Sequence, residues 1–461
     1  MSRRRTLEPA APPLSPIPSQ PQPLGLVWKI TAALILLAYA ALGAGHIYTT
    51  PVAPSPEFNY INAPDEAAHI MYVRSVAVGG RLPVRGNRDF PTYEWHQPPL
   101  YYWIISTLFR FGPIALRWGS LIMGAAALVV IFLGARLAAP NDPPLAVLAF
   151  GFAALLPMRQ ATTSAVGNDV LIELIFSAAI VSMIVAFRSG LTIHRAALIG
   201  MLLGAALLTK ATGLLLVVAI LAGFFLLWRA GEDRRSILTG GLIVFGLGAT
   251  LTVGWFARNI HLYHELTPAK AFLQEFEGTK KASDIIRGDF TRTDYLRVVS
   301  EMTFQSFWAA YTPHAKAARE GTFPDTITLR QQEFYARNGI PMFMPAPFYV
   351  PYGVICTICL VGLIRMCVRR GAAAIQWSTS VLALLTLVLV LAAFVAFVWT
   401  FFQTQGRYLY PALLPISLFI AAGYREIVGP RYRDAATYLA LGLFAALALV
   451  FLFAGIQPAY S

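Results

Sequence analysis

The chain has 461 residues, of which 57% are hydrophobic and 13% are charged, with a formal net charge of +13. A soluble fold needs more charged side chains than this to cover its surface, so the composition excludes an ordinary soluble protein and indicates a chain that a lipid bilayer solvates. The positive charge does not indicate nucleic-acid binding, because the basic residues stand mostly at the ends of apolar runs or in one long polar loop. Basic residues at such positions are typical of contacts with anionic lipid head groups.

The N-terminus combines three arginines with a proline-rich stretch and then an apolar run. Residues 1–23 are therefore predicted to be a disordered tail. The apolar run, residues 24–45, is long enough to cross a bilayer and more such runs follow, so we interpret it as an uncleaved first helix and not as an export signal.

Eleven apolar segments are candidate transmembrane helices, at about 20 apolar residues per crossing. They cover residues 24–45, 114–138, 145–158, 170–187, 196–208, 213–228, 237–256, 348–367, 378–402, 410–422 and 435–454. With the N-terminus in the cytoplasm, every short loop on the inner side carries arginine, as the positive-inside rule expects. The predicted fold class is an all-α polytopic membrane protein with about eleven transmembrane helices.

Two longer polar stretches would then lie outside the cytoplasm. The first loop, residues 46–113, belongs to an N-terminal transmembrane module that spans residues 24–258. The second, residues 259–347, is long enough for a small folded subdomain. Residues 348–461 form the predicted C-terminal transmembrane helices.

The first outer loop contains a polar run that suits chemistry at the membrane surface. Asp65 and Glu66 open a predicted helix over residues 66–78, and Asp65, His69 and Tyr72 share one face of it. Asp65 has two interpretations: it caps the helix, or it acts as a general base just outside the bilayer. The spacing alone does not decide between them.

Basic side chains also stand at outer helix ends, where the positive-inside rule predicts few of them: Arg159, Lys210, Arg258 and Arg407. Their similar depth indicates one shared anion, such as a lipid-linked phosphate or pyrophosphate. The alternative is that each side chain reaches the head groups separately. Asp169 and Glu173, one helical turn apart, either serve the same site or simply pair with Arg159 or Lys210.

Other chemical motifs are weak. The sequence has no P-loop, no G-x-S-x-G and no Rossmann glycine run, so nucleotide chemistry on the inner side lacks a site. No cluster of metal ligands is evident either, and we expect a metal to be dispensable.

Two motifs of the first loop resemble a known family. The stretch from Pro64 to Ser75, with Gly79-Gly80-Arg81-Leu82-Pro83 downstream, resembles the first outer loop of GT-C fold glycosyltransferases. The nearest resemblance is to the protein O-mannosyltransferase and lipid A aminoarabinose transferase group and to related bacterial membrane proteins. The stretch from His96 through the proline pair to Trp103 resembles the motif that closes this loop, and the segments 255–263 and 406–411 resemble later landmarks.

The resemblance implies an inverting glycosyltransferase in the bacterial cytoplasmic membrane. It would move a sugar from a polyprenyl-phosphate donor to an acceptor hydroxyl on the outer face, without a cofactor. The acceptor would be a glycan, a lipid or a protein, and nucleic acid is not expected as a partner.

The resemblance also implies a set of site residues. Asp65 would be the catalytic acid residue, with Glu66 as its neighbour. The side chains expected to bind substrate are His69, Tyr72, His96, Gln97, Tyr101, Lys210, Arg258 and Arg407. Where the aminoarabinose transferases have a Glu-Lys pair, this chain has His96-Gln97, so Arg258 or Arg407 would have to compensate in binding phosphate.

Two other classes of function stay open. A transporter or flippase of an anionic lipid or solute also uses charged residues at helix ends. It needs polar sites near the bilayer midplane and broken helices, whereas the predicted spans are mostly apolar in their middles and show no internal repeat. The third class is a non-catalytic assembly subunit that has kept the fold.

Overall fold

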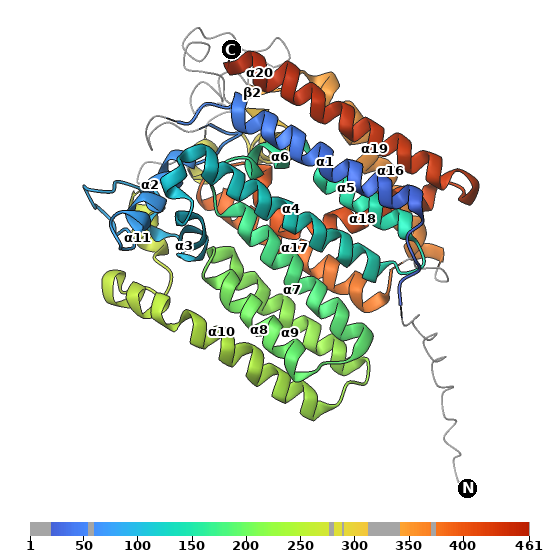
Figure 1. Ribbon diagram of the computed structural model, residues 1–461, viewed down its shortest axis with the longest axis horizontal. Coiled ribbons are helices and arrows are strands. Elements are labelled where there is room, and N and C mark those ends of the chain that lie inside the picture. The colour runs from blue at the N-terminus through green and yellow to red at the C-terminus, as the bar shows by residue number, and fades with distance from the viewer. Residues whose placement is uncertain are drawn as a thin grey trace.

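The protein is a bundle of long helices (Figure 1). The computed structural model describes residues 20–53, 60–275, 281–287, 290–311, 342–369 and 375–460. Within these ranges the strands are β1 (Ala310–Tyr311) and β2 (Met342–Phe343), an antiparallel pair. The predicted fold class, an all-α polytopic membrane protein, is confirmed.

Eight helices of the described residues are long and apolar enough to cross a bilayer, or nine if one bent pair counts as a single span. Five of them are single helices: α1 (Leu26–Thr49), α4 (Pro113–Ala138), α7 (Asp169–Ser189), α10 (Arg234–Tyr263) and α17 (Trp377–Thr400). The other three include short 3-10 or π-helical turns: η3 (Ala211–Gly213) with α9 (Leu214–Arg229), η4 (Ala346–Phe348) with α16 (Val350–Arg369), and η6 (Pro430–Tyr432) with α19 (Arg433–Val450), η7 (Phe451–Ile456) and α20 (Gln457–Tyr460). The bent pair is α5 (Pro143–Ala154) and α6 (Pro157–Thr163), at 62° to each other.

The predicted count of eleven spans is not confirmed. All eleven predicted segments fall on helices, but α8 (Ile193–Leu207) and α18 (Leu413–Ile427) have only 15 residues each. At about 1.5 Å per residue such a helix reaches about 22 Å, short of a hydrocarbon core of roughly 30 Å. The prediction counted apolar content without requiring this length.

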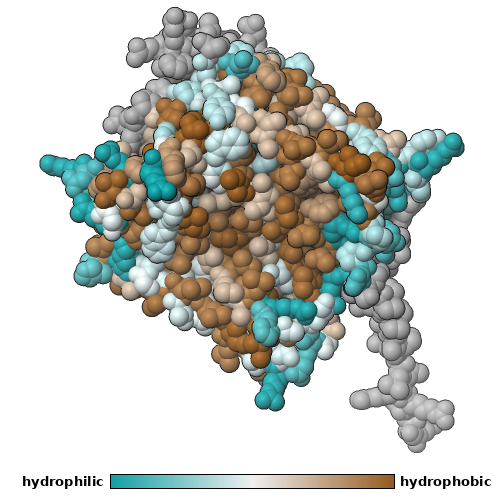
Figure 2. Space-filling model, viewed as in Figure 1, coloured by the Kyte–Doolittle hydropathy of each residue, from teal (hydrophilic) through white to brown (hydrophobic). Residues whose placement is uncertain are grey.

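The surface of the bundle is that of a protein in lipid. Large apolar side chains such as Leu37, Leu242 and Leu384 are exposed on the flanks of α1, α10 and α17. Figure 2 shows hydrophobic residues over the central part of one face and hydrophilic residues toward its ends. A continuous exposed apolar surface of this kind is stable only against hydrocarbon.

Small residues let the helices approach closely. A Cβ added to Gly362 of α16 would lie 1.9 Å from the carbonyl oxygen of Gly423 in α18. Because lipid tails are as apolar as the helices, close backbone packing is what holds transmembrane helices together. This pair packs α16 and α18 backbone to backbone.

One end of the bundle gathers the segments that the sequence placed outside. It holds α2 (Glu66–Ala77), η1 (Tyr93–His96), α3 (Leu100–Ser106), η2 (Phe109–Phe111) and α11 (Ala269–Glu275), and Figure 1 shows α2, α3 and α11 together there. It also includes α12 (Ala282–Ile285), α13 (Arg292–Trp308) and η5 (Gly406–Ala412). Most of the predicted tail and residues 276–280, 288–289 and 312–341 of the second outer segment lie outside the described residues, and the domain boundaries stay predictions.

Candidate active site

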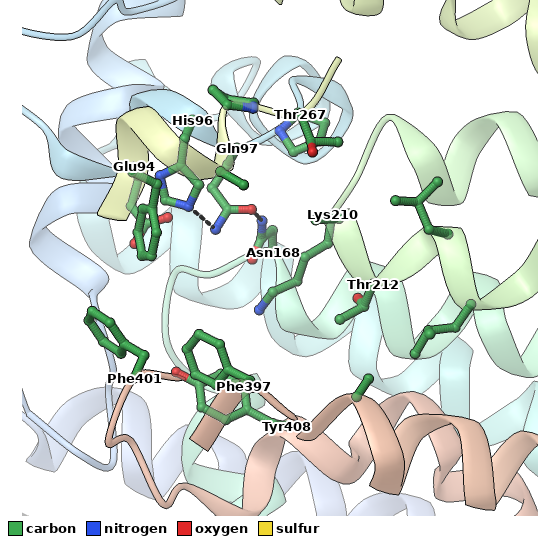
Figure 3. Close-up of a pocket in the computed structure, with 18 of the residues that line it drawn as sticks. Glu94, His96, Gln97, Asn168, Lys210, Thr212, Thr267, Phe397, Phe401 and Tyr408 are labelled. Carbon is green, nitrogen blue, oxygen red and sulfur yellow. Dashed lines mark hydrogen bonds between the residues drawn. The ribbon is translucent and has the colours of Figure 1, made fainter. Parts of the chain in front are cut away.

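A cavity of about 820 Å³ lies at this end of the bundle. Its polar part is lined by Asp65, His69, Glu94, His96, Gln97, Lys210 and Arg407, and its apolar part includes Leu207, Leu214, Leu215, Val390, Phe394 and Phe397. Figure 3 shows the Lys210 side chain reaching into the cavity between Gln97 and Asn168 on one side and Phe397 and Tyr408 on the other. Charged and apolar walls therefore meet in one space.

Asp65 stands just before α2 in an uncommon backbone conformation. Its φ of 59° is left-handed, which aspartate tolerates better than most residues but which is uncommon outside turns and functional sites. Its carboxylate makes no capping hydrogen bond to α2. It accepts hydrogen bonds from the Tyr93 hydroxyl at 2.9 Å and from Arg407 Nη2 at 2.8 Å. The capping interpretation of Asp65 is therefore wrong.

Arg407 joins two carboxylates that come from distant parts of the chain. One guanidinium nitrogen pairs with Asp65 and the other with Asp169, and the Arg407 side chain is only 3% exposed. Asp169 in turn forms an ion pair with Lys210. The four groups alternate in charge, as Asp65, Arg407, Asp169 and Lys210.

Gly406 allows η5 to pack closely enough to position Arg407 at the cavity. A Cβ on Gly406 would lie 2.4 Å from backbone atoms of Phe307, near the end of α13. The Gly406 N–H also donates a hydrogen bond to Ser306 Oγ at 2.9 Å. Only glycine permits this approach, which positions Arg407 at the cavity.

Burial and charge act differently on the titratable groups outside the membrane spans. Burial raises the pKa of Glu94, and the neighbouring carboxylate of Asp65 adds to this effect. Burial alone would also raise the pKa of Asp65, but Arg407, His69 and the Tyr93 hydroxyl outweigh it and hold that pKa below its ordinary value. Burial lowers the pKa of His69, and lowers that of His96 to about 4. Asp65 is thus ionised and both imidazoles are neutral at neutral pH.

Asp65, His69 and Glu94 offer one ligand-type atom each within 4.8 Å of one another. The sequence analysis missed this cluster, because Glu94 belongs to η1 and only the fold brings it to the start of α2. The signal that could have found it is the carboxylate itself, two residues before the His96-Gln97-Pro98-Pro99 motif.

His96 and Gln97 line the cavity as predicted for substrate contacts. Gln97 Nε2 lies 3.1 Å from His96 Nε2, and Asn168 donates a hydrogen bond to Gln97 Oε1 at 3.0 Å (Figure 3). Their roles in binding stay predictions. Asn168, Tyr93 and Tyr408 also line the cavity, and the sequence analysis did not single them out.

Glu66 does not line the cavity. Its side chain is 0% exposed and forms an ion pair with Arg117, whose Nε donates to Glu66 Oε1 at 2.7 Å. The same oxygen accepts a hydrogen bond from the Val166 N–H at 3.0 Å. These contacts tie α2 to α4 and to the segment before α7.

Three other predicted contact residues also lie outside the cavity lining. The Tyr72 hydroxyl donates to the Gln97 carbonyl at 3.0 Å, and the Tyr101 hydroxyl lies 2.8 Å from Ser120 Oγ. Arg258 donates to the Pro83 carbonyl at 2.7 Å and lies over the Trp255 ring. Tyr72 and Arg258 thus contact two residues that line the cavity, Gln97 and Trp255, without lining it themselves.

The four basic residues at outer helix ends therefore separate into two groups. Lys210 and Arg407 meet at Asp169, but Arg159 is fully buried and pairs with Glu173, with Arg159 Nη2 2.7 Å from Glu173 Oε1. Glu173 pairs with Arg159 alone, as the pairing alternative expected, whereas Asp169 pairs with Lys210 and Arg407 at the edge of the cavity. A site shared by all four cations is not what the structure shows.

The comparisons with known proteins agree with this fold. The family model described as dolichyl-phosphate-mannose-protein mannosyltransferase matches residues 96–256. No curated protein matches the chain.

Similar solved structures include an oligosaccharyltransferase from Archaeoglobus fulgidus. Its complex with Zn and sulfate has a TM-score of 0.54 at 16% identity, covering 94% of this chain and 53% of that chain. The oligosaccharyltransferase AglB from Archaeoglobus fulgidus, in complex with an inhibitory peptide and a dolichol-phosphate, has a TM-score of 0.51 at 15% identity, covering 94% of this chain and 55% of that chain. ArnT from Cupriavidus metallidurans, bound to undecaprenyl phosphate, has a TM-score of 0.48 at 14% identity, covering 95% and 74%.

This chain spans about half the length of the oligosaccharyltransferase chains that it matches. The likeness extends over nearly all of this chain, and the resemblance that the first-loop motifs predicted is confirmed at the level of fold. The chain has the GT-C membrane fold, and a third of it matches the mannosyltransferase family model.

Proposed function

We propose that the protein is an inverting glycosyltransferase of a bacterial cytoplasmic membrane, with its N-terminus in the cytoplasm. It transfers a sugar from a polyprenyl-phosphate donor to a hydroxyl of a glycan, lipid or protein on the outer face. The observation that carries the proposal is the meeting of Lys210, Arg407 and Asp65 in one cavity that continues into an apolar wall. A lipid-linked phosphate needs both halves of such a site, cations for its head and apolar side chains for its tail.

The two cations bind the phosphate of the donor. In the described structure they are engaged by Asp65 and Asp169. The donor phosphodiester, which carries one negative charge, enters beside them, takes over part of this pairing and loosens the contact between Arg407 and Asp65. The guanidinium fork and the ammonium group then stabilise the charge that grows on the leaving phosphate, in a site partly shielded from water.

Asp65 acts on the acceptor. Its carboxylate is ionised at neutral pH because Arg407, His69 and Tyr93 hold its pKa down. It accepts the proton of the acceptor hydroxyl, the oxygen attacks the anomeric carbon, and the bond to the lipid phosphate breaks. A single displacement of this kind inverts the configuration at that carbon.

The apolar wall suits the polyprenyl chain. Leu214 and Leu215 of α9 face the cavity together with Phe394 and Phe397 of α17. Both helices are candidate membrane spans, which suits a chain that extends from the cavity into the lipid phase. The names of the matched family and of the AglB complex both include dolichol-type phosphates, which supports a donor of this class.

The transporter alternative is not favoured. The break between α5 and α6 is the kind of feature that a transporter would use. The basic side chain at this break, Arg159, is fully buried against Glu173 and is not part of the cavity lining. The break therefore offers no charged group to a passing substrate.

The experiment that tests the function uses the purified chain in lipid nanodiscs with synthetic polyprenyl-phosphate sugars. We expect binding of the donor and transfer to an acceptor in total membrane glycolipid or protein. Arg407→Ala should weaken donor binding by about 10–150-fold, the equivalent of losing a charge-assisted hydrogen bond of roughly 1.5–3 kcal/mol. Arg110→Ala, which removes an exposed arginine of the first outer loop, is the matched control. Absence of donor binding by the intact chain would refute the proposal.

A further inference from the structure

The last described helix, α20, contacts the first outer loop. The Tyr460 hydroxyl donates a hydrogen bond to Asn62 Oδ1 at 2.6 Å, although 398 positions of the chain separate the two residues. The Tyr460 ring also stands edge-on to the Tyr60 ring, with 5.3 Å between the two centroids. Tyr60 and Asn62 are only 2% and 1% exposed. The hydrogen bond therefore lies away from water, where it is stronger than at the surface.

Asn62 belongs to a tight turn that comes just before Asp65. The Ala63 N–H donates to the Tyr60 carbonyl at 3.0 Å and closes this turn. Asp65 follows two residues after Ala63, with its left-handed φ of 59°. A residue other than glycine is strained in this conformation, which persists only where the surrounding structure holds it. The turn is one of two segments that can hold Asp65 in place.

The other segment begins with Glu66, which pairs with Arg117. Both segments are attached to Thr50, next to the end of α1. Asn62 Nδ2 donates to Thr50 Oγ1 at 3.2 Å, and the Thr50 carbonyl accepts a hydrogen bond from Arg117 Nη1 at 2.6 Å. The residues before and after Asp65 are thus fixed to one point of the bundle, and α20 adds a second attachment for the residues before it.

A π-helical segment sets the direction in which Tyr460 points. The last span runs as α19, then as the π-helical η7, then as α20. A π-helical turn takes up an extra residue, so it rotates the residues beyond it around the helix axis. On one side of η7 the Phe451 ring lies 5.8 Å from the His46 ring of α1. On the other side a Cβ on Gly455 would lie 2.8 Å from Met344 Sδ, beside β2, which Figure 1 shows next to α20. π-Helical turns inside α-helices are frequent at functional sites.

We propose that Tyr460 is a positioning residue for Asp65. Its hydroxyl holds Asn62, and with it the turn that sets the left-handed conformation of Asp65. Tyr460 does not line the cavity, so it reaches the reacting groups only through this turn. That the positioned carboxylate serves as a base rests on the proposed function, whereas the attachment of the turn to α20 does not.

Tyr460→Phe tests the hydrogen bond, because it removes the hydroxyl and keeps the ring against Tyr60. Hydrogen–deuterium exchange is measured by mass spectrometry on the full chain in nanodiscs, without donor. The amides of residues 60–69 should exchange about 2–10-fold faster in the variant, the change expected for loss of one hydrogen bond between neutral groups. Tyr438→Phe, which removes the hydroxyl of an α19 tyrosine whose ring stacks on Trp28, should exchange as the wild type does. Equal exchange of residues 60–69 in Tyr460→Phe and the wild type overturns the proposal.

Transfer kinetics distinguish positioning from a general loss of stability. In Tyr460→Phe, kcat per folded molecule should fall about 2–10-fold, while KM for the donor stays close to that of the wild type because Lys210 and Arg407 belong to other segments. Asn62→Leu should lose at least as much, and adding Tyr460→Phe to it should cost little more, because both changes remove the same contact.

The two measurements separate this proposal from the proposed function. Faster exchange of residues 60–69 with an unchanged kcat, or a full additional loss in the double variant, overturns the positioning role of Tyr460. If the intact chain transfers no sugar, the proposed function fails, while faster exchange in Tyr460→Phe still supports the attachment of the turn before Asp65 to α20.

Discussion

Arg407 Nη2 lies 2.8 Å from Asp65 Oδ2, although 342 positions of the chain separate the two residues. The contact joins η5, near the last spans, to the start of α2 in the first outer loop. Neither half of the chain contains the proposed site by itself, because the carboxylate comes from one half and its counter-ion from the other.

Asp65→Asn tests the proposed base. The amide keeps one accepting oxygen, for Arg407, and its NH2 group can donate to the Tyr93 hydroxyl oxygen in place of the bond that Tyr93 donates in the wild type, but it cannot take a proton. We expect it to insert, fold and bind donor lipid, and to lose about 10²–10⁴-fold in the rate of transfer. Turnover is measured at saturating donor in nanodiscs. Near-normal turnover would show that another group removes the proton.

Glu66→Gln is the contrasting change at the adjacent carboxylate. It leaves the buried Arg117 without its ionic partner, and breaking a buried pair typically costs about 3–5 kcal/mol. We therefore expect a lower unfolding temperature and poor yield, with nearly normal turnover per folded molecule. A stable but inactive Glu66→Gln protein would contradict the structural role of Glu66.

Lys210→Ala and Arg258→Ala distinguish the cavity from its supports. Lys210 reaches into the cavity, whereas Arg258 contacts the Pro83 carbonyl and the Trp255 ring behind the wall. Donor affinity should fall at least about tenfold in Lys210→Ala, the low end of what loss of a charged contact costs, and stay close to that of the wild type in Arg258→Ala. Equal losses in both variants would mean that Arg258 also reaches the phosphate.

Gly406→Ala tests the placement of η5. The added methyl group would collide with the Phe307 backbone, so η5 must shift and carry Arg407 with it. Donor affinity and unfolding temperature should fall together. Gly429→Ala is the control, since a Cβ there meets nothing within 4 Å. If Gly406→Ala bound donor normally, the position of Arg407 would not depend on this contact.

The pH dependence of stability reports on Glu94. In the folded chain the pKa of Glu94 is above its ordinary value of 4.5. At a pH between 4.5 and this raised pKa, Glu94 is therefore more protonated in the folded state than in the unfolded state. Stability from this group therefore rises as the pH falls through that window and is lost as the pH rises. Glu94→Gln removes a buried charge, so at neutral pH it should unfold at a higher temperature than the wild type, and this difference should shrink as the pH falls. An advantage independent of pH would mean that Glu94 does not titrate there.

The sequence predicted those features that depend on local composition. Apolar runs located all eleven helices that the prediction named, although length excludes α8 and α18 from the candidate spans. Lys210 and Arg407 were found because cations at outer helix ends break a local rule, and they do line the cavity.

What the sequence could not predict depends on tertiary partners. Glu66 follows Asp65 directly, yet a neighbouring position on a helix points about 100° away and here meets Arg117 instead of the cavity. Tyr101 follows the proline pair but turns toward Ser120. Glu94 was missed because its partners at the start of α2 are distant along the chain.

The bridge that Arg407 makes between Asp65 and Asp169 also bears on the order of events in the proposed reaction. As long as Arg407 is paired with Asp65, the carboxylate is a weak base. An acceptor that binds before the donor is therefore not deprotonated. Only the donor phosphate competes for the arginine. The arrangement thus predicts an ordered kinetic mechanism, with donor first and acceptor second.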